Sequence, residues 1–214
     1  MRKIVWLFAL LLSLGLTSCI DIIDEINLNA DKSGTVFIGL ESKMLASIMG
    51  MAEEQIDTST INQFMSFPKE SADRLKNIKG VHEINAFDII SKGRIGIGFS
   101  FDNPKALNKA YYALLEMEKA WYQPNIVKIR KHKIIRMNLT PQLVKQIEKE
   151  NPKLKDSEFV KYLNIKTILK LPNNIKEVEC ADDLRVIDNK EVAMRYSFLE
   201  VLKEKKSTAY KIRF

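Results

Sequence analysis

The residue with the clearest chemical role is Cys19, which closes an apolar run behind a short basic start. Two basic residues precede the apolar stretch Ile4–Leu16, and the run ends in Leu16-Thr17-Ser18-Cys19. In a bacterial lipoprotein signal this order allows the cysteine thiol to receive a diacylglycerol, and a peptidase then cuts before the cysteine. We therefore expect lipidation at Cys19 and removal of residues 1–18 from the mature protein.

Two other interpretations of this segment stay open: an uncleaved signal anchor, or an ordinary secretory peptide in which Cys19 stands by chance. The lipoprotein interpretation is favoured because leucine at −3, small residues at −2 and −1, and cysteine occur together. The stretch Ile4–Leu16 is also shorter than the ~20 residues that span a bilayer. Because two or three acyl chains hold a protein firmly at a membrane, we expect a lipid-anchored, extracytoplasmic domain at residues 19–214 in the cell envelope.

The second cysteine, Cys180, has no partner within the chain once Cys19 carries lipid, so no internal disulfide is expected. It ends the alternating segment Lys176–Cys180, in which Val178 and Cys180 share one face of a predicted strand. That position favours a small buried hydrophobe over a reactive thiol.

The remaining polar residues form no catalytic or metal-binding motif. The two histidines, His82 and His132, fall in different predicted strands, and neither belongs to an H-E-x-x-H pattern. Asp21, Asp24 and Glu25 cluster after the signal, and paired carboxylates can perform acid–base work or bind calcium. Their spacing matches no EF-hand loop, and no G-x-S-x-G nucleophile elbow is present. We expect a non-enzymatic protein without metal or cofactor.

The charge is unevenly divided along the chain. Loss of the two basic residues of the signal lowers the formal net charge from +7 to +5; residues 19–123 carry −4 and residues 124–214 carry +9. A basic half on a tethered protein can face anionic headgroups or an acidic wall polymer, and it can equally be a solvated surface. The candidates for anionic contact are Lys128, Arg130, Lys131 and Lys133. Nucleic acid is not expected as a partner, because this patch lacks aromatics for base stacking.

A helix predicted from Ser42 to Gln55 carries an apolar stripe rich in methionine. Such a stripe is typical of a core-facing helix, but flexible methionine side chains also bind varied apolar ligands or partners. The candidates for apolar contact are Met44, Ile48, Met49 and Met51.

The elements that position these residues alternate between strands and helices, with strands at both ends of the domain. A hairpin is predicted at 20–40, and a helix–strand–strand–helix unit begins near Lys69 and continues past the helix start Asp102-Asn103-Pro104. Next come a basic hairpin at 125–139, two short helices, and strands at 165–171, 176–180, 184–187, 191–197 and 208–213. This order predicts one α+β domain, with a mainly antiparallel sheet and helices packed on one side.

The layout resembles the LppM-like domain of bacterial lipoproteins. The resemblance rests on three patterns: the strand and glycine turn in Ile22–Val36, the helix–strand–strand–helix unit with its Asp102-Asn103-Pro104 start, and the break at Leu169–Asn174 before the terminal strands. It implies an extracytoplasmic α+β domain with a lipid-binding role and no catalytic residues to transfer.

The sequence therefore predicts a membrane-anchored lipoprotein that binds a lipid, an apolar ligand or another envelope component. Two alternatives remain: a structural or assembly subunit that binds an envelope protein, and an enzyme acting on envelope material.

Overall fold

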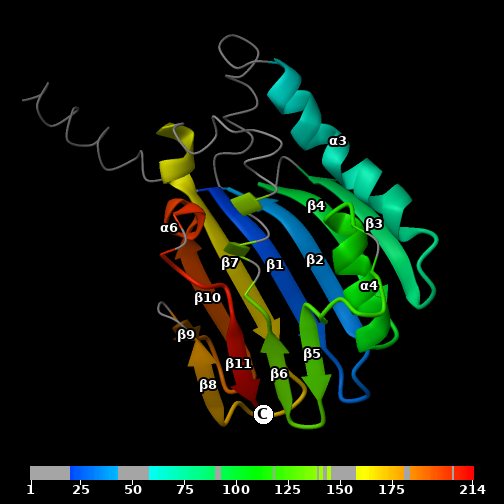
Figure 1. Ribbon diagram of the computed structural model, residues 1–214, viewed down its shortest axis with the longest axis vertical. Coiled ribbons are helices and arrows are strands. Elements are labelled where there is room, and N and C mark those ends of the chain that lie inside the picture. The colour runs from blue at the N-terminus through cyan, green and yellow to red at the C-terminus, as the bar shows by residue number, and fades with distance from the viewer. Residues whose placement is uncertain are drawn as a thin grey trace, which may run out of the picture.

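Two β-sheets and a small set of helices build the domain (Figure 1). The computed structural model describes residues 20–42, 58–89, 93–117, 119–138, 140–141, 144–145, 158–180, 184–203 and 205–214. The larger sheet has seven strands in the order β3-β4-β2-β1-β7-β10-β9, and the smaller has four in the order β5-β6-β11-β8. The predicted α+β class with mainly antiparallel pairing is confirmed.

The larger sheet is antiparallel at every neighbouring pair except β1 and β7. In that pair Ile20 to Asn27 run parallel to Leu163 to Lys170, so the start of the domain lies beside a segment some 140 residues later. The strands are β1 (Ile20–Leu28), β2 (Gly34–Glu41), β3 (Val81–Ile89), β4 (Arg94–Phe101), β7 (Leu163–Lys170), β9 (Leu184–Val186) and β10 (Glu191–Ser197).

The smaller sheet combines a hairpin with two strands from the end of the chain. The hairpin turns at Lys131 and His132, and its second strand pairs with the last strand, whose other neighbour ends at Cys180. The strands are β5 (Val127–Arg130), β6 (Lys133–Arg136), β8 (Glu177–Cys180) and β11 (Tyr210–Arg213).

Helices α3 (Thr58–Leu75) and α4 (Pro104–Leu114) cover the same face of the larger sheet (Figure 1). Helix α4 begins where the sequence predicts: the Asn103 side chain accepts hydrogen bonds from the backbone N–H groups of Lys105 and Ala106, and Pro104 occupies the first turn. The 3-10 helix η3 (Glu158–Tyr162) and the short helix α6 (Phe198–Leu202) lie at the end of the sheet where β1 begins.

The core lies between the helix-covered face of the larger sheet, helix α4 and the smaller sheet. Alternate residues of β1, among them Ile26 and Leu28, point into this core, as do Phe99 and Phe101 of β4. Helix α4 contributes Leu107 and its neighbours, and the smaller sheet contributes Val127, Ile134, Tyr210 and Ile212. A second, smaller cluster surrounds Ile20 at the other end of β1.

A buried ion pair crosses this core. Asp24 of β1 is 8 % exposed, and its carboxylate accepts a hydrogen bond from Arg136 of β6 and another, 2.6 Å long, from the Tyr111 hydroxyl of α4. The Arg136 guanidinium also lies 5.1 Å from the centre of the Tyr111 ring. Burial and the neighbouring Asp24 charge raise the pKa of Tyr111 well above its usual value, so its hydroxyl keeps its proton and donates. One carboxylate thus joins both sheets and α4.

The sequence placed most elements correctly and differs from the structure in four respects. The strands fall in two sheets instead of one; the parallel pair of β1 and β7 is consistent with the predicted mainly antiparallel pairing. Helix α3 begins at Thr58, well before the predicted Lys69, and continues through Pro68. Strand β7 begins at Leu163 instead of at the predicted residue 165, and α6 was not predicted.

We predict that Asp24→Asn destabilises the fold by about 3–5 kcal/mol, because it leaves the Arg136 charge buried without its partner. Urea unfolding followed by circular dichroism measures the loss. Asp73→Asn is the matched control: it breaks the exposed pair with Lys76 and should change stability little. Equal losses in the two variants would contradict the role given to Asp24.

Candidate functional site

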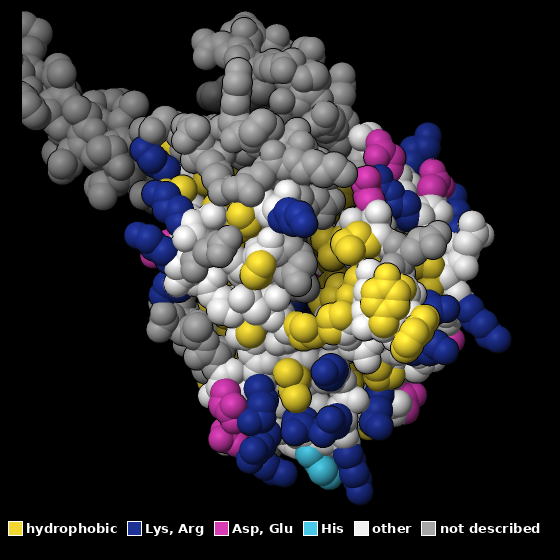
Figure 2. All heavy atoms as spheres, in the orientation of Figure 1, with side chains coloured by type: hydrophobic (Ala, Val, Ile, Leu, Met, Phe, Trp, Pro, Cys, Tyr) yellow, Lys and Arg dark blue, Asp and Glu magenta, His cyan; other side chains and the backbone are white. Residues whose placement is uncertain are grey.

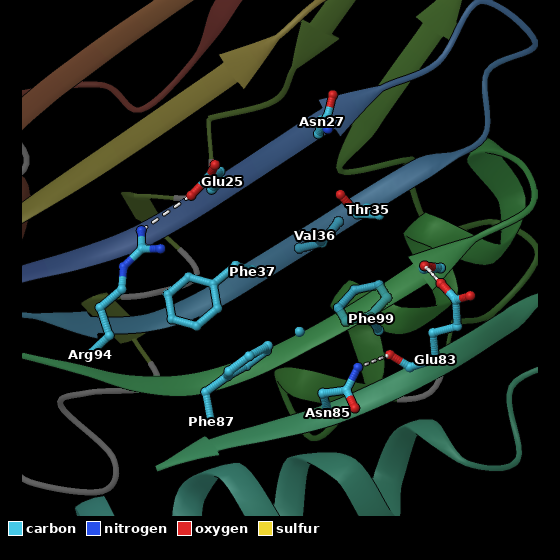
Figure 3. A pocket seen from close by; sticks show the side chains of 12 residues that line it. Glu25, Asn27, Thr35, Val36, Phe37, Glu83, Asn85, Phe87, Arg94 and Phe99 are labelled. Carbon is cyan, nitrogen blue, oxygen red and sulfur yellow. Dashed lines mark hydrogen bonds and ion pairs between the residues drawn. The ribbon is translucent and has the colours of Figure 1, made fainter. Parts of the chain in front are cut away.

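A cleft of about 490 Å³ lies on the face of the larger sheet opposite helix α4, which we call the open face (Figure 3). Strands β1, β2, β4 and β3 lie side by side there, and each supplies residues to the cleft. The lining residues are Glu25, Asn27, Thr35, Val36, Phe37, Glu83, Asn85, Phe87, Arg94, Gly98, Phe99 and Ser100.

Two phenylalanines form the apolar part of the cleft. The rings of Phe37 and Phe87 meet edge to face with their centres 5.8 Å apart, and Figure 3 shows them next to each other above the sheet. Gly98 makes this arrangement possible: a Cβ atom there would lie 2.5 Å from a ring carbon of Phe87. The guanidinium of Arg94 covers the Phe37 ring at 4.6 Å from its centre.

One end of the cleft is closed by ion pairs. Glu25 accepts hydrogen bonds from Lys170 at 2.8 Å and from Arg94 at 3.2 Å, and Arg94 also pairs with Glu41 at 2.9 Å. Burial raises the pKa of Glu25, but Lys170 and Arg94 outweigh it, so this pKa lies below its usual value. The hydrogen bond to Glu25 raises the pKa of Lys170. Both shifts favour the charged forms of Glu25 and Lys170, which pair with each other.

The other end carries uncharged hydrogen-bonding groups beside one carboxylate. Strand β3 shifts register between His82 and Asn85, and Glu83 within this bulge has a φ of 50°. There the Ser100 hydroxyl donates to the Glu83 carboxylate, and the Asn85 amide donates to the Glu83 carbonyl at 2.9 Å. Across the sheet, Asn27 and Thr35 are exposed and in register with each other.

The cleft offers both apolar and polar groups to a ligand. It presents aromatic surface, amides, hydroxyls, ion-paired side chains and the Glu83 carboxylate, and the described residues lining it include neither histidine nor cysteine. No cluster of three or more His, Cys, Asp or Glu side chains suited to a metal ion occurs in the part of the chain that the structure describes.

The acidic cluster noted in the sequence is divided by the sheet. Asp24 points into the core, whereas Asp21 and Glu25 lie on the open face, because neighbouring residues of a strand point to opposite sides. Asp21 accepts hydrogen bonds from Arg195 and Glu25 from Lys170, so each carboxylate has a cationic partner. The three carboxylates therefore form no common site.

The residues proposed from the sequence fall elsewhere. Lys128 and Arg130 lie on β5, Lys131 in the hairpin turn and Lys133 on β6, none of them in the cleft. The apolar candidates Met44, Ile48, Met49 and Met51 lie outside the described residues, as does Cys19. His82 pairs with Asp102 at 2.9 Å on the surface. Cys180 pairs in register with Tyr210.

Comparison with solved structures gives a match at low similarity. No family model matches the sequence, and no curated protein matches it. The NMR structure of the folded domain of LppM from Mycobacterium tuberculosis aligns with 92 % of this chain and 91 % of its own, at 10 % identity and a TM-score of 0.41. A likeness at this level assigns neither a family nor a function to the chain. None of the helices in the described residues has the length and hydropathy needed to cross a membrane.

The Glu25 ion pairs predict a specific pH dependence of stability. Since the pKa of Glu25 is lowered by folding, its contribution is present above pH ~4.5 and is lost as the pH falls through the folded-state pKa. Since the pKa of Lys170 is raised, its contribution is present below pH ~10.5 and is lost as the pH rises through the folded-state pKa.

Glu25→Gln should remove both contributions, costing about 1 kcal/mol or less near neutral pH because the groups are partly exposed. Urea unfolding at a series of pH values from 3 to 11 measures the difference from the wild type, which should shrink at both extremes. Glu116→Gln, which breaks the surface pair with Arg74, is the control. A difference that stays constant with pH would contradict the assignment.

Proposed function

We propose that this chain is a bacterial envelope lipoprotein, anchored through Cys19, whose open-face cleft holds a neutral amphipathic molecule. The observation that carries the proposal is the pair Phe37 and Phe87 standing beside uncharged hydrogen-bonding groups on an exposed sheet face. Known small-molecule sites combine apolar walls with a few polar groups in volumes of about 300–1,000 Å³, and the cleft has about 490 Å³.

The charges of the cleft favour a ligand without a strong net charge. Lys170 and Arg94 are already neutralised by Glu25 and Glu41, so an anionic head would have to displace a carboxylate. Asn27 and Thr35 make no side-chain hydrogen bond within the described residues, and both are exposed beside the aromatic pair. Amides and hydroxyls in such a position suit a hydroxyl-bearing head, with the apolar portion of the ligand on the phenylalanines.

The start of β1 supports a domain held close to the bilayer. Ile20 directly follows Cys19 and is 6 % exposed within the small cluster that includes Leu163 and Phe198. A lipid-bearing Cys19 would therefore be followed directly by a folded strand, with no linker between the anchor and the domain. This limits how far the domain can move from the membrane. We assign the cleft a binding role, because its aromatic pair and uncharged polar groups provide contacts for a ligand.

Octyl glucoside, used below its critical micelle concentration, is a suitable probe because it joins an uncharged hydroxyl-rich head to an alkyl chain. We predict binding to the wild type by isothermal titration calorimetry, and about tenfold weaker binding to Phe87→Ala, because the aromatic wall is lost. Nonanoate, which carries the same octyl chain on an anionic head, should bind less well.

Trp121→Ala is the matched control, since Trp121 is an aromatic residue 94 % exposed outside the cleft. It should leave octyl glucoside binding unchanged. Equal weakening in both variants, or no binding to the folded wild type, would overturn the cleft assignment.

The anchor has its own test. Cys19→Ala removes the thiol that would receive the lipid, so the variant should leave the membrane fraction and appear in the soluble extracytoplasmic fraction. Fractionation with immunoblotting, together with metabolic labelling by a fatty-acid analogue, measures the change. Labelled, membrane-bound Cys19→Ala protein would contradict lipidation at this residue.

The alternative role, assembly with another envelope protein, has one feature in its favour. Trp121 and Tyr122 stack edge to face on a loop and are 94 % and 73 % exposed. Exposed aromatics of this kind are enriched at the centres of protein interfaces. A change in assembly size in Trp121→Ala, with octyl glucoside binding absent from the wild type, would favour this alternative.

A further inference from the structure

The outward face of the smaller sheet carries a row of like charges in adjacent strands. Arg130 of β5 is in register with Lys133 of β6, and Lys133 is in register with Arg213 of β11. Their neighbours Ile129, Ile134 and Ile212 lie on the opposite, core-facing side. Like charges directly across strands destabilise a sheet, so folding alone does not account for this row.

Acidic residues compensate only one side of this face. Glu177 and Glu179 of β8 pair with Arg213 at 3.0 Å and with Lys211 at 2.5 Å. On the hairpin side, Lys128, Arg130, Lys131 and Lys133 have no ion pair among the described residues. Figure 2 shows Lys and Arg side chains gathered at the lower end of the molecule, where Figure 1 places this hairpin.

A second group of donors continues the basic surface beyond the hairpin turn. A hollow of about 440 Å³ is lined by Lys176, Lys190 and His132 together with the amides of Asn173 and Asn174 and by Phe214. It adjoins the row of cations because the Lys176 N–H donates to the Arg213 carbonyl and the Phe214 N–H donates to the His132 carbonyl. Neither lysine has an ion pair within the described residues, and Asp188 nearby caps the backbone N–H groups of residues 190 and 191.

We propose that this surface, formed by the β5–β6 hairpin, the outward face of β6 and β11 and the adjoining hollow, binds a linear polyanion with repeating phosphate or carboxylate groups. Adjacent strands are about 4.8 Å apart, so a chain laid across β5, β6 and β11 meets a cation at every strand. A series of charges on one chain matches a row of cations better than an isolated ion does.

A polymer fits this surface better than the bilayer that would hold Cys19. The hairpin turn and Phe214 lie at the opposite end of the molecule from Ile20, the residue after the proposed lipid (Figure 1). This step rests on the proposed anchor. The surface also lacks residues for insertion: the exposed large hydrophobic residues of the described chain are Met117, Trp121, Tyr122, Tyr162, Val186 and Ile187, none of which belongs to it.

The test uses the full-length Cys19→Ala protein without detergent, so that neither lipid on Cys19 nor detergent affects the vesicles, with three probes: fluorescent polyphosphate, poly-L-glutamate, and vesicles of phosphatidylcholine with 30 % phosphatidylglycerol. We expect polyanion binding that weakens as salt rises, because each neutralised charge releases a counterion. The triple variant Arg130→Gln/Lys131→Gln/Lys133→Gln should bind at least tenfold more weakly at low salt, with a shallower salt dependence. Comparison of polyphosphate with poly-L-glutamate identifies the anionic group.

The control variant Lys69→Gln/Lys105→Gln/Lys109→Gln removes the same charge from exposed positions of α3 and α4. It should retain the wild-type affinity. Equal weakening in the two triple variants would assign binding to net charge and overturn the proposal. Binding to the vesicles but to neither polymer would overturn it too, as would no binding to any probe. Because these residues lie outside the cleft, failure here leaves octyl glucoside binding by Phe37 and Phe87 intact, and the two proposals fail separately.

Discussion

The contact on which the structure depends is the buried carboxylate of Asp24, held by Arg136 and Tyr111. These three residues come from the larger sheet, the smaller sheet and α4, so a single charge fixes the three layers relative to one another. Burial and the Asp24 charge act in opposite directions on the pKa of Arg136, and the net effect raises it, so the pair stays charged. A buried pair of this kind tolerates little displacement, because the desolvation of both ions must be matched by close contact.

The same strand fixes the candidate site. Asp24 and Glu25 are neighbours on β1, and the pleat sends one into the core and the other to the open face. A shift of one residue in the pairing of β1 would place Glu25 in the core and remove the partner of Lys170 and Arg94. The correct register for the buried pair is therefore also the register that completes the cleft.

Local pattern was enough to predict most elements, because the alternation of Arg94–Phe101 and the Asn103–Pro104 start act over short distances. Both β1 and β7 were predicted as strands from their own residues. Their parallel pairing could not be predicted, because it joins segments that are distant in the sequence and leaves no local pattern. The predicted start of α3 at Lys69 was too late: the helix begins at Thr58 and continues through Pro68, although proline is unfavourable inside a helix. The sequence predicted both the basic residues of the hairpin and its hairpin structure. It did not predict that the hairpin lies away from the cleft.

The cleft could not be predicted because Glu25, Phe37, Phe87 and Arg94 belong to four strands and become neighbours only through pairing. One partial signal existed: Gly96 and Gly98 alternate within an otherwise bulky strand, which marks a place where another group approaches the sheet closely. In the structure Phe87 occupies the space above Gly98. Without the register of β3 against β4, the glycines alone did not identify that residue.

The unequal charge of the two halves of the sequence has a structural explanation. The acidic first half supplies Asp21, Asp24, Glu25 and Glu41, and the basic second half supplies their partners Arg195, Arg136, Lys170 and Lys166. Much of this pairing lies across the neighbouring strands β1, β7 and β10, so opposite charge helps two distant segments to associate there. The second half carries more cations than this seam uses, and those of the hairpin lie on the outward face of the smaller sheet. The fold therefore neutralises the open face and leaves a concentrated positive charge at the opposite end from Ile20, which separates a nearly neutral cleft from a basic surface within one small domain.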